Sequence, residues 1–324
     1  MLNSDPHSMT LATACGRRLC KTRYANGRVD DYSAARIFDL TAVQAHDLAT
    51  LAGLLGVLAG RRDTCVLRGA IRDPHRSQGV RRLLHPDAST GDAPTLAETP
   101  RAWLALDLDG LPLPAGTDPR DLHLCGRVAR AALPAPFHGA ACVVAATAGH
   151  GFKDGARLRL WFLLDRALSG DECKRWLRDA PVDLSVFGAV QPIYTAAPLF
   201  RGMADPLPVR LVTLDGAERV APPAETQHVR AAPHTPGLLQ RPGQYALHAL
   251  TRAYGAVAAA PEGARHPTAV AEAWGLALLV EHGLLAESDV ARAIDHALQV
   301  AGKPAGEGQK IVTWAVAQRA RNAE

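Results

Sequence analysis

The sequence predicts an α+β protein in which a mixed sheet is followed by a small all-helical region. Three observations support this class. Short apolar runs alternate with helical segments over residues 25–220, two of these runs (141–149 and 156–164) follow each other without a helix, and the apolar spacing is helical from residue 244 onward. Alternating strands and helices give a sheet covered by helices, and two adjacent strands add an antiparallel pair.

Composition limits the classes of protein that the chain can belong to. Of its 324 residues, 48% are hydrophobic and 21% are charged, which suits one large or two modest globular domains. No run of about 18 apolar residues is present, and the stretch MLNSDPHSMT lacks the order of a secretory signal. The six cysteines form no CxxC pair, so neither a zinc site nor a disulfide framework is indicated. We therefore expect a cytoplasmic protein without a membrane span.

The N-terminal part is expected to begin with a flexible segment, residues 1–24. A helix is predicted over residues 33–60, because Thr41 is a typical N-cap and the apolar residues recur at helical spacing. Residues 64–71 form a short β-rich run. The segment up to residue 100 is rich in proline, glycine, serine and charged residues, which predicts a long loop.

The centre of the predicted domain begins with an acidic strand, LALDLDG, at residues 104–110. A helix is expected at 118–133, and another at 169–180, where Ser169 and Glu172 form a capping box. The other segments are predicted strands or mixtures of strand and turn: 141–149, 156–164, 182–200 and 208–216. Residues 221–243 are rich in proline and polar residues and predict a linker. The helical domain, 244–324, has four helical segments: 245–260, 266–283, 286–302 and 306–323.

Two carboxylates interrupt the apolar pattern of the acidic strand. Successive side chains of a strand point to opposite faces, so Asp107 and Asp109 share one face. Two like charges at this spacing repel each other unless one is protonated or a cation lies between them, and Mg²⁺ prefers carboxylate oxygens. The alternative is a strand that ends in a solvated turn, with Asp109-Gly110 as turn residues.

Basic residues form the second cluster. In ARLRLWFLL, alternation places Arg157, Arg159 and Trp161 on one face of a strand. The two arginines need an anionic partner, which is either the Asp107/Asp109 pair in a structural network or a bound triphosphate. A third acid, Asp183, follows the capped helix, and its alternative role is that of a turn residue. The net charge of +4 permits a nucleic-acid partner without requiring one.

These motifs, in their order, resemble the archaeo-eukaryotic primase superfamily, in particular the primase-polymerase-like proteins of phages, plasmids and integrated elements. That family has Asp-x-Asp or Asp-x-Glu on a strand, then a strand with a phosphate-binding basic residue, usually His, and then a further Asp after a helix. Here LDLD, GARLRLWFLLDR and VDLSVF take these places. The segment QPIYTAAPLFRGMADPLPVR and the C-terminal helices also resemble the mobile-element branch.

The resemblance implies an RRM-like catalytic core over residues 25–220 and a site for two Mg²⁺ or Mn²⁺ ions. Asp107, Asp109 and Asp183 would be the catalytic and metal-binding residues. The expected His is absent from the second strand, so Arg157 or Arg159 would bind the nucleotide in its place. His150, in TAGHG, is the other candidate for nucleotide binding, and its alternative role is that of a solvated loop residue.

The function implied by the resemblance is that of a DNA primase-polymerase that makes primers for replication of a mobile element. Its partners would be a single-stranded DNA template and nucleoside triphosphates, and a replicative helicase is left open. Two alternatives remain at the level of sequence. One is a primase-like replication initiator or DNA-binding protein with little or no catalysis, and the other is a metal-dependent nuclease that uses the same carboxylates.

Overall fold

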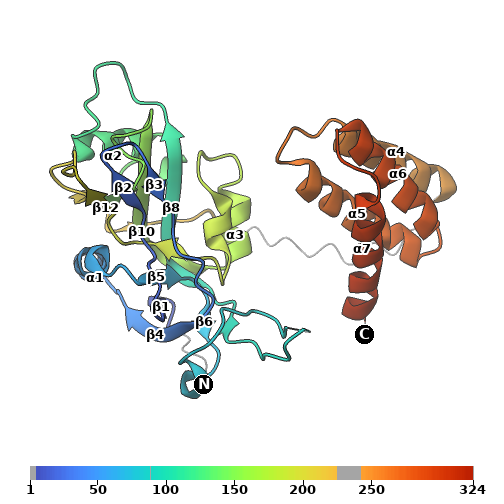
Figure 1. Cartoon of the computed structure of the whole chain (residues 1–324), viewed down its shortest axis with the longest axis horizontal. Helices are drawn as coiled ribbons and strands as arrows, with labels where there is room; N and C mark the ends of the chain where they lie inside the picture. The colour runs from blue at the N-terminus through green and yellow to red at the C-terminus, as the bar shows by residue number, and fades with distance from the viewer. Residues whose placement is uncertain (1–4, 88, 225–241, 324) are drawn as a thin grey trace. The chain divides into compact units, whose positions relative to one another are not determined.

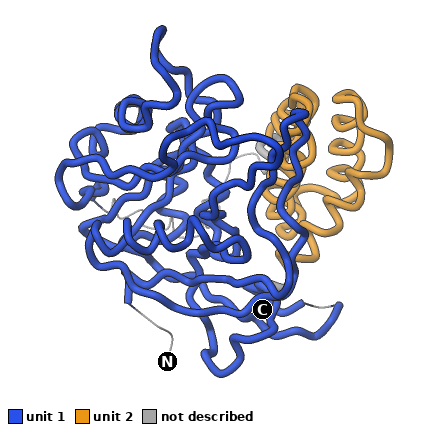
Figure 2. The backbone as a smooth tube through the Cα atoms, turned by 60° about the vertical axis from the view of Figure 1, so that its left-hand side comes forward, with its two compact units in different colours: residues 1–226 blue, residues 227–324 orange. Residues whose placement is uncertain are grey.

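The computed structural model describes residues 5–87, 89–224 and 242–323. The chain divides into two compact units, Met1–Thr226 and Gln227–Glu324, coloured separately in Figure 2. Most of the predicted linker, 221–243, lies outside the described residues. We describe each unit by itself.

The α+β class predicted from the sequence is confirmed, since the first unit combines several sheets with helices (Figure 1). Its strands are β1 (Ser8–Ala14), β2 (Thr22–Tyr24), β3 (Val29–Asp30), β4 (Phe38–Gln44), β5 (Thr64–Leu67), β6 (Ala70–Ile71), β7 (Leu96–Ala97), β8 (Arg101–Leu111), β9 (Cys142–Ala146), β10 (Ala156–Leu168), β11 (Ile193–Tyr194), β12 (Leu199–Arg201), β13 (Leu211–Leu214) and β14 (Arg219–Val220). Its helices are α1 (Leu48–Gly60), α2 (Leu122–Ala131) and α3 (Gly170–Trp176), with short 3₁₀ turns η1 (Pro74–Arg76), η2 (Ala135–Phe137) and η3 (Leu184–Phe187).

The expectation of a flexible segment at residues 1–24 is wrong for the described part. Strand β1 lies inside a four-stranded sheet of order β11-β5-β1-β4 and pairs antiparallel with both neighbours. Met9, Ala12 and Ala14 on this strand are buried. Strand β2 belongs to a three-stranded sheet of order β12-β2-β3. The N-terminal segment is ordered because partners distant in sequence pair with it, and such partners leave no trace in local periodicity.

The helix predicted over 33–60 is also partly wrong. Residues Phe38–Gln44 form β4, in which Phe38 and Leu40 are buried against β1. Helix α1 begins only after Asp47, whose carboxylate accepts a hydrogen bond from the Thr50 backbone N–H at 2.7 Å. Asp47 therefore takes the N-cap role that was assigned to Thr41. The alternation of buried side chains in β4 and its pairing with β1 outweigh the weak helical propensity of the segment.

The second large sheet carries the acidic strand. Its order is β13-β9-β10-β14, and β8 also pairs with β10. Because β8 and β9 are both antiparallel to β10, they run parallel to each other, with α2 in the connection between them. This arrangement is a split β-α-β unit. Strand β13 lies beside β9 in this five-stranded sheet, and the more specific RRM-like core stays a prediction.

Buried side chains connect this sheet to the rest of the unit. Trp103, Phe137 and Trp161 are fully buried in its core. Arg68, which is 3% exposed, donates hydrogen bonds to the carbonyl oxygens of Trp103 and Leu168, both at 3.0 Å. Arg68 follows β5 of the first sheet, so its guanidinium joins the two sheets. The predicted capping box of Ser169 and Glu172 is present at the start of α3.

The described residues of the second unit form four helices, in the region where the sequence has helical spacing: α4 (Pro242–Ala258), α5 (Arg265–Glu281), α6 (Glu287–Val300) and α7 (Glu307–Ala323). Their inward faces form a core of their own, which includes Leu276, Val290, Ile294, Leu298 and Val312. Among the described helices of the chain, none is long and apolar enough to cross a membrane.

A fragment of residues 242–324 is expected to fold alone, because this core is made by its own helices. Ile294→Ala should lower its free energy of unfolding by about 2–5 kcal/mol, since it opens a cavity in that core. Val300→Ala is the matched control, because Val300 is 58% exposed. Circular dichroism during urea unfolding measures both changes. A fragment without cooperative unfolding, or equal effects of the two substitutions, would contradict an independent core.

Candidate functional site

The two acids of β8 meet the two arginines of β10 across the antiparallel pair. In the register, Asp107 lies opposite Arg159 and Asp109 lies opposite Arg157. The Arg159 guanidinium forms an ion pair with the Asp107 carboxylate at 2.5 Å, and Arg157 forms an ion pair with Asp109. The Asp107 side chain is 22% exposed and that of Asp109 is 74% exposed. The first pair is therefore largely withdrawn from solvent, and the second lies at the surface.

Asp183 lies directly beside Asp107. Its backbone N–H donates to the Asp107 carbonyl oxygen at 2.9 Å. The carboxylate of Asp183 caps η3, where it accepts hydrogen bonds from the backbone N–H of Ser185 at 2.8 Å and from the Ser185 hydroxyl at 2.9 Å. The structure thus brings the three predicted acids together, and it also gives Asp183 the turn role that the sequence left as its alternative.

One cavity of about 410 Å³, here called the outer cavity, is lined by all three acids and by both arginines. Its size is within the range of small-molecule sites. It contains residues that the sequence did not single out: Lys21 and Arg23 from the β2 region, Asp31 and Tyr32, and Lys153. Lys21 and Arg23 were missed because their segment was expected to be flexible. Lys153 lies in the glycine-rich turn directly before β10, the strand that carries Arg157 and Arg159. This position in the sequence could have identified Lys153 as a residue of the site.

His150 is not available as a nucleotide ligand in this structure. Its side chain is fully buried, one ring nitrogen lies 2.8 Å from the Pro119 carbonyl oxygen, and the other accepts the Arg157 backbone N–H at 3.2 Å. Burial lowers its pKa, although the Pro119 contact opposes this shift. The alternative of a solvated loop residue is wrong, because the side chain is buried. His150 holds the turn 147–151 against the start of β10, and in this way it supports the backbone of Arg157.

The buried His150 predicts a dependence of stability on pH. Because its folded-state pKa lies below the ordinary value of 6.5, the unfolded chain binds more protons below about pH 6.5, and stability falls as the pH is lowered from there. His150→Gln removes this dependence but keeps His7, whose pKa is also lowered. The stability advantage of the wild type over the variant should therefore narrow between pH 7 and pH 5 in urea titrations. If the difference in free energy of unfolding between the wild type and His150→Gln stayed constant from pH 7 to pH 5, the buried imidazole of His150 would not be neutral.

The metal prediction depends on the chemistry of the donors and not on their present arrangement. The three predicted carboxylates and that of Asp31 line one cavity, and oxygen ligands of this kind suit Mg²⁺ or Mn²⁺. Within the described part of the chain, however, no group of three His, Cys, Asp or Glu side chains is placed to hold one ion. Asp107 and Asp109 bind arginines instead, so an ion would have to take over these contacts.

Comparisons with known proteins find a distant structural likeness but no matching family. No known protein family matches the sequence, and no curated protein does so either. The chain has a distant likeness to a solved structure described as the crystal structure of primase RepB', with 12% sequence identity and a TM-score of 0.25, over 97% of this chain and 94% of that chain. A likeness at this TM-score is too remote to assign a fold or an activity.

Proposed function

We propose that the protein is a primase-polymerase that carries out metal-dependent, template-directed nucleotidyl transfer on single-stranded DNA. The observation that carries this proposal is the composition of the outer cavity, which is lined by Asp107, Asp109 and Asp183 together with Arg157 and Arg159. Phosphoryl transfer needs cation ligands and anion-binding groups next to each other. The motif order that resembles the primase superfamily supports the same assignment.

Each group has a distinct role in this proposal. Asp107 and Asp109 would hold the divalent cations, together with Asp183, which lines the same cavity. These ions, when bound, would activate the attacking 3′-hydroxyl and neutralise the leaving pyrophosphate. The triphosphate would be bound by Arg157, Lys153 and Arg23, because all three line the outer cavity. Arg159 is 9% exposed, and it would position Asp107 as well as contribute charge.

One observation favours a second candidate, a primase-like protein that binds DNA without catalysis. Both acids of β8 are neutralised by arginines of the same sheet. The pair of Arg159 and Asp107 holds this acid in place without any ion, because loss of either partner would leave a buried charge unpaired. Such a protein would bind single-stranded DNA and nucleotides but would not join them.

Incorporation of labelled ribo- and deoxynucleotides on single-stranded DNA, with Mg²⁺ or Mn²⁺, tests the proposal. Metal-dependent product that follows the template sequence supports it. Template binding without product would overturn it in favour of the binding protein, and a shortened template would overturn it in favour of a nuclease. A reaction with EDTA is the control for the metal, and a template of a single repeated base is the control for template direction.

A further inference from the structure

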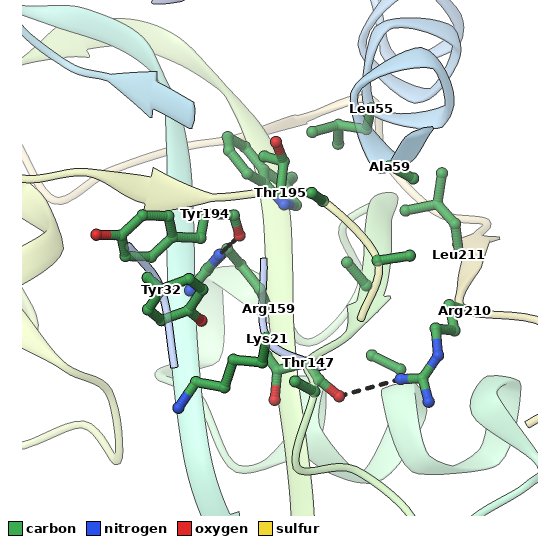
Figure 3. Close-up of a pocket in the computed structure, with 16 residues that line it drawn as sticks. Lys21, Tyr32, Leu55, Ala59, Thr147, Arg159, Tyr194, Thr195, Arg210 and Leu211 are labelled. Atoms are coloured by element: carbon green, nitrogen blue, oxygen red, sulfur yellow. Dashed lines mark hydrogen bonds between the residues drawn. The ribbon is translucent and has the colours of Figure 1, made fainter. Parts of the chain in front are cut away.

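A second, smaller cavity of about 60 Å³ adjoins the outer cavity, and we call it the inner cavity. Several residues line both cavities, among them Lys21, Tyr32 and Arg159. Figure 3 shows Leu55 and Ala59 of α1 on one side of the inner cavity and Thr195, which follows β11, nearby. The inner cavity is therefore lined by helix α1, by β11 of the first sheet and by β9 and β10 of the second.

Three residues that line the inner cavity each carry a buried polar atom without a hydrogen-bond partner among the described residues: Trp161 Nε1, Arg159 Nε and Thr195 Oγ1. Trp161 is fully buried, and Arg159 is 9% exposed. The other nitrogens of Arg159 are occupied by Asp107 and by the Tyr194 carbonyl oxygen. Folded proteins leave few buried polar atoms unpaired, and three around one cavity indicate a ligand that accepts hydrogen bonds.

The charge around the inner cavity has one sign. Lys21, Arg159 and Arg210 line it, and no acidic side chain among the described residues does so. The acids that pair with these cations, Asp31, Asp107 and Asp205, lie outside the lining. These ion pairs hold the cations in place, while the polar atoms of Trp161 and Arg159 are N–H donors only and that of Thr195 is a hydroxyl.

We propose that the inner cavity binds one phosphate group. The ionised oxygens of a phosphate only accept hydrogen bonds, whereas every nucleobase and every sugar also brings donors that would remain unpaired against Trp161 Nε1 and Arg159 Nε. The cavity has room for about five water-sized groups, which suits one phosphate and not a whole nucleotide. The proposed function is used only to name the source, which is the terminal phosphate of a bound nucleotide or the pyrophosphate that nucleotidyl transfer releases.

The indole N–H of Trp161 offers a direct measurement. In the full chain labelled with ¹⁵N-tryptophan, the five tryptophans give five indole signals, and the signal lost in Trp161→Phe is that of Trp161. Adding inorganic phosphate or pyrophosphate, with NaCl used to keep the ionic strength constant, should shift this signal in a saturable way. Thr195→Val, which removes only the hydroxyl, should weaken this binding about tenfold or more, because hydrogen bonds to a charged group are strong.

Two controls separate the inner cavity from other effects. Thr213→Val changes an exposed threonine of β13 and should leave the affinity unchanged. Arg157→Gln alters the outer cavity only, so phosphate should still shift the Trp161 signal. If the shift occurs only with a non-hydrolysable nucleoside triphosphate, the source is the nucleotide; if it also occurs with free pyrophosphate, the product binds.

Two results would overturn the phosphate site: a Trp161 signal that none of these ligands moves, or an affinity that Thr195→Val leaves unchanged. Should Trp161→Phe fail to fold, the Trp161 signal is assigned by elimination, with the other four tryptophans each replaced by phenylalanine. These outcomes are independent of catalysis. A saturable Trp161 shift in a protein that incorporates no nucleotide would refute the polymerase function and leave the phosphate site standing.

Discussion

Replacing Asp107 with asparagine is expected to lower nucleotide incorporation by at least about a hundredfold, a loss typical of removing one essential electrostatic group from an active site. The asparagine keeps the size of the side chain and one oxygen that can accept from Arg159. The fold should therefore change little. The charge that would bind a divalent cation is nevertheless lost, and an amide oxygen is a much weaker ligand for Mg²⁺ than a carboxylate.

Asp165→Asn is the matched control for this substitution. Asp165 lies on β10 like the arginines, but it is exposed and does not line the outer cavity. Incorporation should be unchanged in this variant, and circular dichroism should show both variants folded. If Asp107→Asn retained full incorporation, the metal role of the acidic strand would be refuted. If Asp107→Asn and Asp165→Asn lowered nucleotide incorporation equally, the loss would reflect the change in net charge and not this site.

Strand alternation in the sequence predicted which of these acidic and basic side chains share a face. Asp107, Asp109, Arg157 and Arg159 were placed on common faces by strand alternation alone, and the structure pairs them in register. The pairing of β8 with β10 could not be derived in this way, because strand order depends on contacts between distant segments. This pairing leaves the ion-pair alternative, which the sequence had kept open, as the arrangement present in the structure.

Other features of the site had no local signal. Lys21 and Arg23 reach the outer cavity because β2 pairs with β12, more than a hundred residues later in the chain. His150 lies in a glycine-rich turn that is typical of solvated loops, yet Pro119 and the Arg157 backbone enclose it. Trp161 was predicted to share a face with the arginines, but its unpaired indole N–H is visible only once β9, α1 and β11 are placed around it.

The two arginines of β10 should respond very differently to truncation. Arg159→Ala is expected to lower the free energy of unfolding by about 3 kcal/mol, the lower end for breaking a buried ion pair, since the Asp107 side chain keeps 22% exposure. It also removes a hydrogen bond to the Tyr194 carbonyl oxygen. Arg157→Ala should change stability by no more than about 1 kcal/mol, because its partner Asp109 is 74% exposed and can return to water.

Thermal unfolding and nucleotide titration together test this contrast. For a unit of this size each kcal/mol lowers the melting temperature by roughly 2–4 °C, so Arg159→Ala should melt clearly below Arg157→Ala. Arg157→Ala should instead bind nucleoside triphosphate about tenfold more weakly at nearly normal stability, since it loses charge-assisted hydrogen bonds in the outer cavity. Equal melting temperatures would refute the structural role of Arg159. Unchanged nucleotide affinity in Arg157→Ala would mean that this arginine serves Asp109 alone, because the remaining cations of the outer cavity would then suffice for the phosphates.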